Sequence, residues 1–174
     1  MEQGYLSPVI SKGGLNQIDL TGVGKRGGEF IESQLATAAS DPELVAATVN
    51  EIVELGEDRK SWLIFSSGIK HARMLLEEFE SHGISVDAVT GEDSKKVRDQ
   101  TIADFKSGKL RCLINVNVLT TGFDHPAVDL IGLIRATAST GLYVQMVGRG
   151  TRIADGKENC LVCDFGANVE RHGF

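Results

Sequence analysis

The stretch Trp62-Leu-Ile-Phe65-Ser66-Ser67-Gly68-Ile-Lys-His71-Ala72 passes from a short apolar run into a helical pattern through a polar turn. The same alternation recurs along the rest of the chain. Short apolar strands that alternate with helices favour a parallel sheet covered on both faces. The sequence therefore predicts an α/β fold with a mostly parallel central sheet. Strands are expected at 62–65, 84–89, 113–116, 130–134 and 160–163, with helices near 69–81, 94–106 and 140–147.

The first 60 residues follow a different pattern. Short strands are predicted at 5–9 and 15–21, broken by Gly13-Gly14, and a turn rich in glycine and lysine follows at 22–28. Helices are predicted near 29–39 and 42–55, the second with Asp41 as its N-cap and Pro42 at its first position. We expect residues 1–60 to be a linker or attachment segment that packs on a core domain formed by 61–174.

Composition limits the classes of function. A chain of 174 residues suits one domain, or one domain with a small attachment. The net charge of -6 disfavours binding nucleic acid by bulk electrostatics. Residues 1–60 hold 5 basic and 10 acidic side chains, whereas 61–174 hold 13 and 14, so a local binding surface is still possible there. The absence of a long apolar run or signal peptide, with three cysteines, predicts a cytoplasmic protein without a membrane partner.

The stretch Gln145-Met-Val-Gly-Arg149-Gly-Thr-Arg152 puts an amide and two guanidiniums at helical spacing. Neighbouring arginines repel each other unless an anion lies between them, and their planar forks suit a phosphate group. Gly148 and Gly150 each cost a helix about 1 kcal/mol relative to alanine. We therefore expect a helix end and a close backbone approach here, with Arg152 just past the helix. The alternative for this stretch alone is a solvated basic face.

Polar turns follow three of the predicted strands, at the edge where open α/β sheets bind ligands. Ser66 and Ser67 follow the first strand and are expected to cap the next helix, where hydroxyls and free N–H groups suit a phosphate. Gly91 follows the second strand and lets a phosphate backbone approach closely. Thr120 and Thr121 follow the third. The alternatives are ordinary capping at the serines and a simple turn at Gly91.

Three segments resemble conserved motifs of superfamily 2 helicases. The stretch 62–72 resembles motif IV, and 145–152 has the Q-x-x-G-R-x-x-R pattern of motif VI. Between them, Val116-Asn-Val-Leu-Thr120-Thr121-Gly122-Phe123-Asp124-His-Pro126 resembles motif V. The three occur in the family's order. The chain is thus similar to the second RecA-like domain of a helicase motor, which implies a three-layer sandwich with helices on both faces of the sheet.

This resemblance implies roles for individual residues. Arg149 and Arg152 would be arginine fingers that stabilise charge on the γ-phosphate of ATP, and Gln145 would reach the same phosphate or the attacking water. Gly122 and Asp124 would contact ATP, with the Asp124 carboxylate at the ribose hydroxyls; its alternative is an Asx-turn. The loops would touch the sugar-phosphate backbone of a single strand through Ser66, Ser67, Gly91, Thr120 and Thr121.

The sequence has no Walker A segment to hold phosphates and no acidic box to hold Mg²⁺. In the family both belong to a first RecA-like domain, so we expect that domain as a partner, in the same chain or another, and no ATP hydrolysis by this chain alone. Gly22-Val-Gly24-Lys25-Arg26 is no P-loop, because no serine or threonine follows the lysine. Cys160 and Cys163 have metal-ligand spacing without a second pair, so no metal site is predicted.

The expected function is that of an ATP-dependent helicase or translocase acting on single-stranded or duplex nucleic acid, with DNA favoured over RNA. The segments 22–30 and 164–173 are similar to RadD-type DNA-repair helicases. The alternative is a non-catalytic module that binds nucleic acid or protein through a degenerate helicase fold, against which the intact pair Arg149 and Arg152 argues. A Rossmann domain is disfavoured, because no glycine fingerprint follows Phe65.

Overall fold

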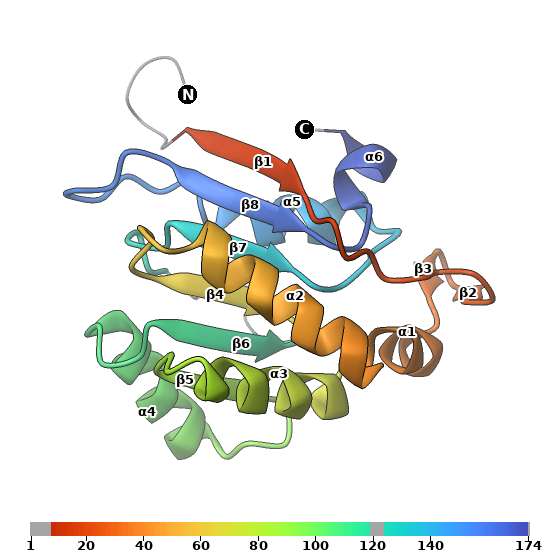
Figure 1. Cartoon of the computed structure of the whole chain (residues 1–174), viewed down its shortest axis with the longest axis horizontal. Helices are drawn as coiled ribbons and strands as arrows, with labels where there is room; N and C mark the ends of the chain where they lie inside the picture. The colour runs from red at the N-terminus through yellow and green to blue at the C-terminus, as the bar shows by residue number, and fades with distance from the viewer. Residues whose placement is uncertain (1–7, 119–123, 174) are drawn as a thin grey trace.

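The computed structural model describes residues 8–118 and 124–173. Its centre is a six-stranded sheet in the order β1-β8-β7-β4-β6-β5, in which every strand pair is parallel (Figure 1). The predicted α/β fold with a parallel sheet is confirmed. The strands are β1 (Val9–Gly13), β4 (Trp62–Phe65), β5 (Val86–Thr90), β6 (Cys112–Val116), β7 (Leu130–Leu133) and β8 (Cys160–Asp164).

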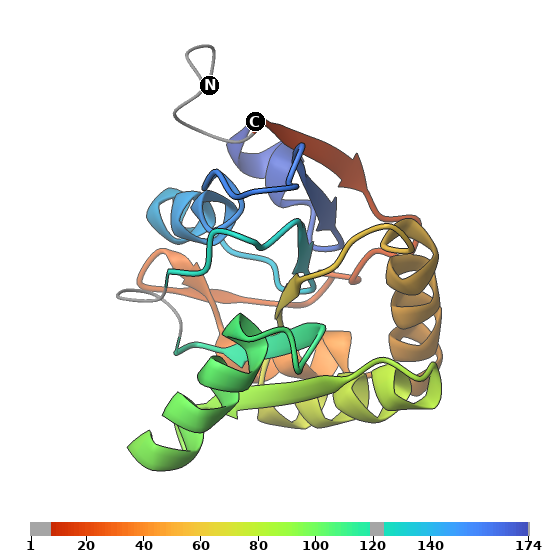
Figure 2. The ribbon, with the colours of Figure 1, turned by 90° about the vertical axis from the view of Figure 1, so that its left-hand side faces the viewer.

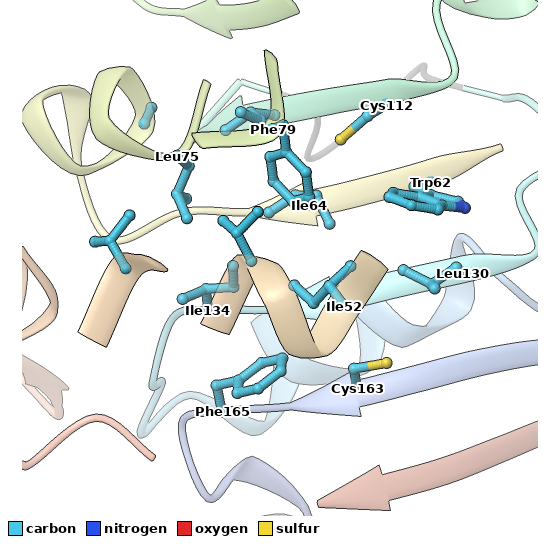
Figure 3. Packing of buried hydrophobic residues seen from close by; sticks show 14 of the residues in the cluster. Ile52, Trp62, Ile64, Leu75, Phe79, Cys112, Leu130, Ile134, Cys163 and Phe165 are labelled. Atoms are coloured by element: carbon cyan, nitrogen blue, oxygen red, sulfur yellow. The ribbon is translucent and has the colours of Figure 1, made fainter. Parts of the chain in front are cut away.

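Helices cover both faces of this sheet, because its inner strands are apolar at successive positions. Trp62 and Ile64 belong to the hydrophobic cluster under α2 (Pro42–Leu55) and α3 (Ile69–Ser81) (Figure 3). Leu63 and Phe65 point to the other face and pack in the cluster that contains Phe105 of α4 (Lys95–Lys106) and Tyr143 of α5 (Thr140–Gly148). These two helices lie on the side of the sheet opposite α2 (Figure 2). Alternate residues of one strand thus belong to the two cores, as the two-residue repeat of a strand requires.

Most predicted elements from residue 42 onward are confirmed, with small shifts at their ends. The strand at 62–65 and the helices at 42–55 and 69–81 have the predicted bounds. Asp41 is the N-cap of α2, although its side chain makes no capping hydrogen bond. Ser94 caps α4 by accepting a hydrogen bond from the Val97 amide at 3.2 Å. A short helix, α6 (Asn168–His172), was not predicted.

The strand predicted at 15–21 is wrong, whereas most of the strand predicted at 5–9 lies outside the described residues. Strand β1 runs from Val9 to Gly13 and pairs with β8, and residues 15–21 form no strand. The physical reason is the buried carboxylate of Glu51 on α2, which accepts the amides of Leu15 at 2.9 Å and Asn16 at 3.3 Å. These amides bind a side chain instead of a neighbouring strand, so the chain leaves the sheet after Gly14.

The rest of the N-terminal segment forms a small hairpin and a helix. Strands β2 (Lys25–Arg26) and β3 (Glu29–Phe30) pair antiparallel across Gly27-Gly28, within the predicted turn, and α1 (Glu32–Ala39) follows. Both turn glycines have positive φ, which favours glycine there. Strand β1 and helix α2 belong to the same sheet and core as the later elements. The division into an attachment segment, 1–60, and a core domain, 61–174, stays a prediction. No helix among the described residues is long and apolar enough to cross a membrane.

Replacing Glu51 with alanine removes the acceptor that holds the amides of Leu15 and Asn16 on α2. Hydrogen bonds to a charged group contribute about 1.5–3 kcal/mol net, so we expect Glu51→Ala to lower the free energy of unfolding by roughly that amount. Urea denaturation followed by circular dichroism measures the change. Glu54→Ala, at an exposed position of the same helix, is the matched control. Equal unfolding midpoints for the two variants would contradict the assignment.

Candidate functional site

The carboxyl ends of β4, β5 and β6 open into a cleft of about 680 Å³. Strands point their carboxyl ends toward the side of the molecule where α1 and the β2–β3 hairpin lie (Figure 1). Of the residues predicted to bind a single strand, Ser67 and Gly91 line this cleft together. Thr120, Thr121 and Gly122 lie outside the described residues. The structure therefore brings the turn after β4 and the turn after β5 to one surface.

Ser66 and Ser67 do not cap α3 as predicted, because their hydroxyls have other partners. The N-cap of α3 is Gly68. The Ser67 hydroxyl donates to the Ile134 carbonyl at 2.7 Å, and the Ser67 amide donates to Nδ1 of His71 at 2.9 Å. The Ser66 hydroxyl lies 3.3 Å from the carbonyls of Gly68 and Asn115. Both serine side chains are buried, so they hold the turn in shape and present little hydroxyl surface.

Gly91 leaves open space in the cleft. A Cβ atom at this position would meet no heavy atom within 4 Å, and the backbone there does not need glycine. The turn is held from within, because the Thr90 amide donates to Oδ2 of Asp93 at 2.8 Å and the Glu92 amide to Oγ1 of Thr90 at 3.1 Å. A phosphate backbone could approach this turn without a side-chain clash.

The charge of the cleft is mixed. Arg26 from β2 is the basic residue among those that line it, and Glu32 and Glu92 are the acidic ones. Asn117, at the end of β6, has a left-handed backbone with φ of 60° and donates its amide to the Glu32 carboxylate. The lining of the cleft is too acidic to attract a polyanion over a distance, so a bound strand would depend on close polar contacts.

Helix α5 carries the glutamine and the first arginine of the 145–152 stretch. Ser139 caps its start by accepting the Leu142 amide at 3.2 Å, and Arg149 is its C-cap residue. Gln145 is exposed on the helix and Arg152 lies past its end, the positions expected from the glycines. A side chain on Gly150 would overlap the sulfur of Cys160 in β8, which explains why the helix ends in a turn pressed against the sheet.

Arg152 and Asp124 come from the two segments that resemble motifs VI and V, and they form an ion pair. Nη2 of Arg152 lies 3.5 Å from Oδ2 of Asp124, and both side chains are about half exposed. Two side chains predicted to contact the same nucleotide are therefore neighbours in space. An exposed pair of this kind adds about 0–1 kcal/mol to stability, so it can separate for a ligand.

Lys157 holds these two loops together, although no sequence motif pointed to it. Its ammonium donates to the carbonyls of Pro126 at 3.0 Å, Gly150 at 2.9 Å and Arg152 at 2.6 Å. Burial lowers the pKa of Lys157, while the nearby Cys160 and Asp129 act in the opposite direction. A lysine in a loop matches no motif, and its role depends on three carbonyls that come together only in the fold.

The described residues hold no group of three or more histidine, cysteine, aspartate or glutamate side chains that could bind a metal ion. Cys160 and Cys163 lie inside β8, and burial raises the pKa of both thiols to about 12. They pack as small apolar residues of the sheet.

Comparison with known proteins identifies the family. The model of the helicase conserved C-terminal domain matches residues 44–154. The chain belongs to this family. It is 31% identical over 151 residues to the putative ATP-dependent helicase IRC3 of Saccharomyces cerevisiae, covering 86% of this chain and 22% of that protein. It is 32% identical over 122 residues to the ATP-dependent RNA helicase ROK1 of the same species, covering 70% and 22%.

The chain spans about a fifth of the length of these curated relatives. Among solved structures, the C-terminal domain of the DEAD-box protein Dbp5 is 26% identical with a TM-score of 0.59, covering 70% of this chain and 71% of that one. A putative HsdR subunit fragment of a type I restriction enzyme from Vibrio vulnificus has a TM-score of 0.72 at 21% identity, covering 98% and 34%. The predicted RecA-like fold is thus confirmed, and the chain is a helicase C-terminal domain of the superfamily 2 type.

His71 makes the stability of this domain depend on pH. Burial lowers its pKa from 6.5 to about 4, and its Nδ1 must stay unprotonated to accept the Ser67 amide. Between these two values the unfolded chain binds one more proton than the folded chain. The free energy of unfolding therefore falls as the pH falls through this window, by about 1.4 kcal/mol per pH unit.

Urea denaturation at pH 7 and pH 5 measures this effect. We expect wild type to lose about 2 kcal/mol more than His71→Gln between the two values, because glutamine can accept the same amide without titrating. His82→Gln, at an exposed histidine, should behave as wild type. The same pH dependence in wild type and His71→Gln would rule out His71 as the source.

Proposed function

We propose that this domain supplies arginine fingers to an ATP-dependent helicase or translocase and holds part of a single strand in the cleft beside α1. The observation that carries the proposal is the ion pair between Arg152 and Asp124 at the end of α5. Family membership and relatives named ATP-dependent helicases support a role in ATP use. A first RecA-like domain would hold the ATP phosphates and Mg²⁺.

Each residue then has a distinct task. Arg149 and Arg152 meet charge that grows as the γ-phosphate departs, so they act mainly on the transition state. Gln145, exposed on α5, orients the attacking water or the same phosphate. Asp124 holds Arg152 while no nucleotide is present and accepts hydrogen bonds from the ribose hydroxyls when one binds. Lys157 fixes the carbonyl of Arg152 and so limits where its guanidinium can reach.

The strand would be bound along its sugar-phosphate backbone, by the turns after β4, β5 and β6. Such contacts position a strand without reading its sequence. The preference for DNA and the RadD-type assignment remain proposals, and ROK1 is named an RNA helicase, so both nucleic acids belong in the tests. A cytoplasmic location is likewise a proposal, since a relative from Schizosaccharomyces pombe, 36% identical over 119 residues, is named mitochondrial.

The arginine roles predict a kinetic signature in a protein that joins this chain to a first RecA-like domain. Arg149→Ala and Arg152→Ala should each lower kcat for ATP by about 10³–10⁵. Arg152→Lys should restore little, because an ammonium cannot reproduce the planar fork. Asp124→Ala should mainly raise KM. The measurement is steady-state phosphate release with saturating single strand.

Two controls accompany this assay. Arg73→Ala changes an exposed arginine on α3 and should leave both constants unchanged. The chain without the first domain should release no phosphate above background, because it lacks the groups that bind phosphates and Mg²⁺. A change in KM alone for both arginine variants, with kcat intact, would show that they are not arginine fingers and would favour the alternative of a solvated basic face.

Strand binding by the chain alone should be weak and only moderately salt-sensitive, with a slope of about -0.7 per phosphate contact. Gly91→Leu should weaken it about tenfold by filling the open space in the cleft. Gly13→Leu is the matched control, because a side chain on Gly13 of β1 also meets nothing within 4 Å. Fluorescence anisotropy with DNA and RNA oligonucleotides measures the binding. Equal affinity of the two leucine variants would remove the cleft from the proposal.

A further inference from the structure

The β2–β3 hairpin touches two places that the proposed function treats separately. Arg26 and Glu29 face each other in the register of the hairpin. Arg26 lines the cleft, whereas the Glu29 carboxylate reaches the segment that leads into α5. That lead-in segment, residues 135–138, comes directly before Ser139, the N-cap of α5. Of these two paired hairpin residues, one therefore lines the cleft and the other contacts the segment that leads into α5.

The Glu29 carboxylate uses both oxygens on its neighbours. Oε2 accepts the Thr137 hydroxyl, and Oε1 accepts the Ala138 amide at 2.6 Å. Burial alone would raise the pKa of Glu29, but these hydrogen bonds and the charge of Arg135 hold that pKa below its ordinary value. The Thr137 hydroxyl in turn accepts the Ser139 amide at 3.0 Å. The start of α5 is thus held by a charged side chain from outside the motif segments.

A second connection runs from the cleft wall to the same segment. Glu32 lines the cleft and accepts the amide of Asn117, whose oxygen accepts the guanidinium of Arg135. Arg135 is the first residue of the lead-in segment. The chain of contacts Glu32–Asn117–Arg135 therefore joins α1 to the lead-in segment, in parallel with Glu29.

The far side of the hairpin is braced by α6. The guanidinium of Arg171 lies 5.0 Å from the ring centre of Phe30, the residue after Glu29, and donates to the Thr137 carbonyl at 3.0 Å. Asn168 accepts the Thr137 amide at 2.9 Å and donates to the Arg135 carbonyl at 2.8 Å. The lead-in segment is held between α6 and the hairpin.

From this geometry we infer that Glu29 is a positioning residue that couples strand occupancy of the cleft to the start of α5. The inference rests on the proposed function, because it takes a strand in the cleft as its input. A phosphate bound at Arg26 restrains the hairpin, and through it the Glu29 side chain. Glu29 passes this restraint to Thr137 and Ala138 through its two hydrogen-bonded oxygens.

Amide hydrogen exchange of the chain, followed by NMR, tests the coupling at the amides concerned. In wild type, saturation with a single-stranded oligothymidine or oligouridine should slow exchange of the Ala138 and Leu142 amides at least threefold. In Glu29→Gln, one of the two acceptor oxygens becomes a donor group. Exchange of Ala138 should be about tenfold faster than in wild type without the strand, and the strand should no longer slow it.

Two measurements separate coupling from a merely structural role. Strand affinity, measured by anisotropy on the same samples, should be the same within twofold for Glu29→Gln and wild type. Glu170→Gln, which removes the same charge from an exposed position on α6, should keep the wild-type response. The amide of Val49 in α2 serves as an internal reference for global opening.

The outcomes are distinct. If the strand binds and slows Ala138 equally in wild type and Glu29→Gln, or in neither, the coupling role of Glu29 is overturned while the cleft remains a strand site. If Glu29→Gln changes exchange at Val49 as much as at Ala138, the residue acts on global stability and the inference fails. If neither oligonucleotide binds wild type, the proposed strand site itself fails, and this inference with it.

Discussion

Strand β4 lies between β6 and β7 and is buried on both faces, and the remaining architecture depends on that constraint. Its backbone is paired on both sides, so its side chains can only point to the two faces. Trp62 and Ile64 are buried under α2 and α3 on one face of the sheet. Leu63 and Phe65 are buried under α4 and α5 on the opposite face. Because every neighbour of β4 is parallel, each connection must cross a face of the sheet and return to the same edge.

This return to one edge explains why residues far apart in the sequence share a surface. The turns after β4 and β5 both line the cleft. The pair of Asp124 and Arg152 lies elsewhere, near the amino ends of β7 and β8, where Gly150 packs against Ile131 and Cys160. What the sheet does not fix is the geometry within each loop. That geometry comes from charged side chains bound to backbone groups: Glu29 before α5, Glu51 after β1 and Lys157 after α5. Each of them binds backbone groups that lie outside the regular pairing of a helix or strand.

The sequence was informative where local pattern and tertiary packing agree. The apolar run 62–65, the helix 69–81 and the glycines around Arg149 each carry their own signal, and the family motifs select one fold among the α/β possibilities. The signal is misleading at Gly13-Gly14, because this pair predicts a break between strands although Gly13 belongs to β1. It is also misleading at Ser66 and Ser67, because their hydroxyls bind backbone carbonyls, among them those of Asn115 in β6 and Ile134 just after β7, instead of capping the helix. Lys157 and Glu29 could not be found at all, because their partners are distant in sequence and are mostly backbone groups.

The pairing of β1 with β8 has a practical consequence for how this domain is handled. The family match begins at residue 44, so a shortened version cut at that point would lose β1 while keeping every recognised motif. Strand β8 is buried along its length and would then be the outermost strand, with a row of unsatisfied backbone donors and acceptors beside apolar side chains. Such an edge recruits other chains. Poor solubility of a trimmed protein would therefore reflect a missing strand, and a single added peptide with the sequence of β1 should be able to bind there.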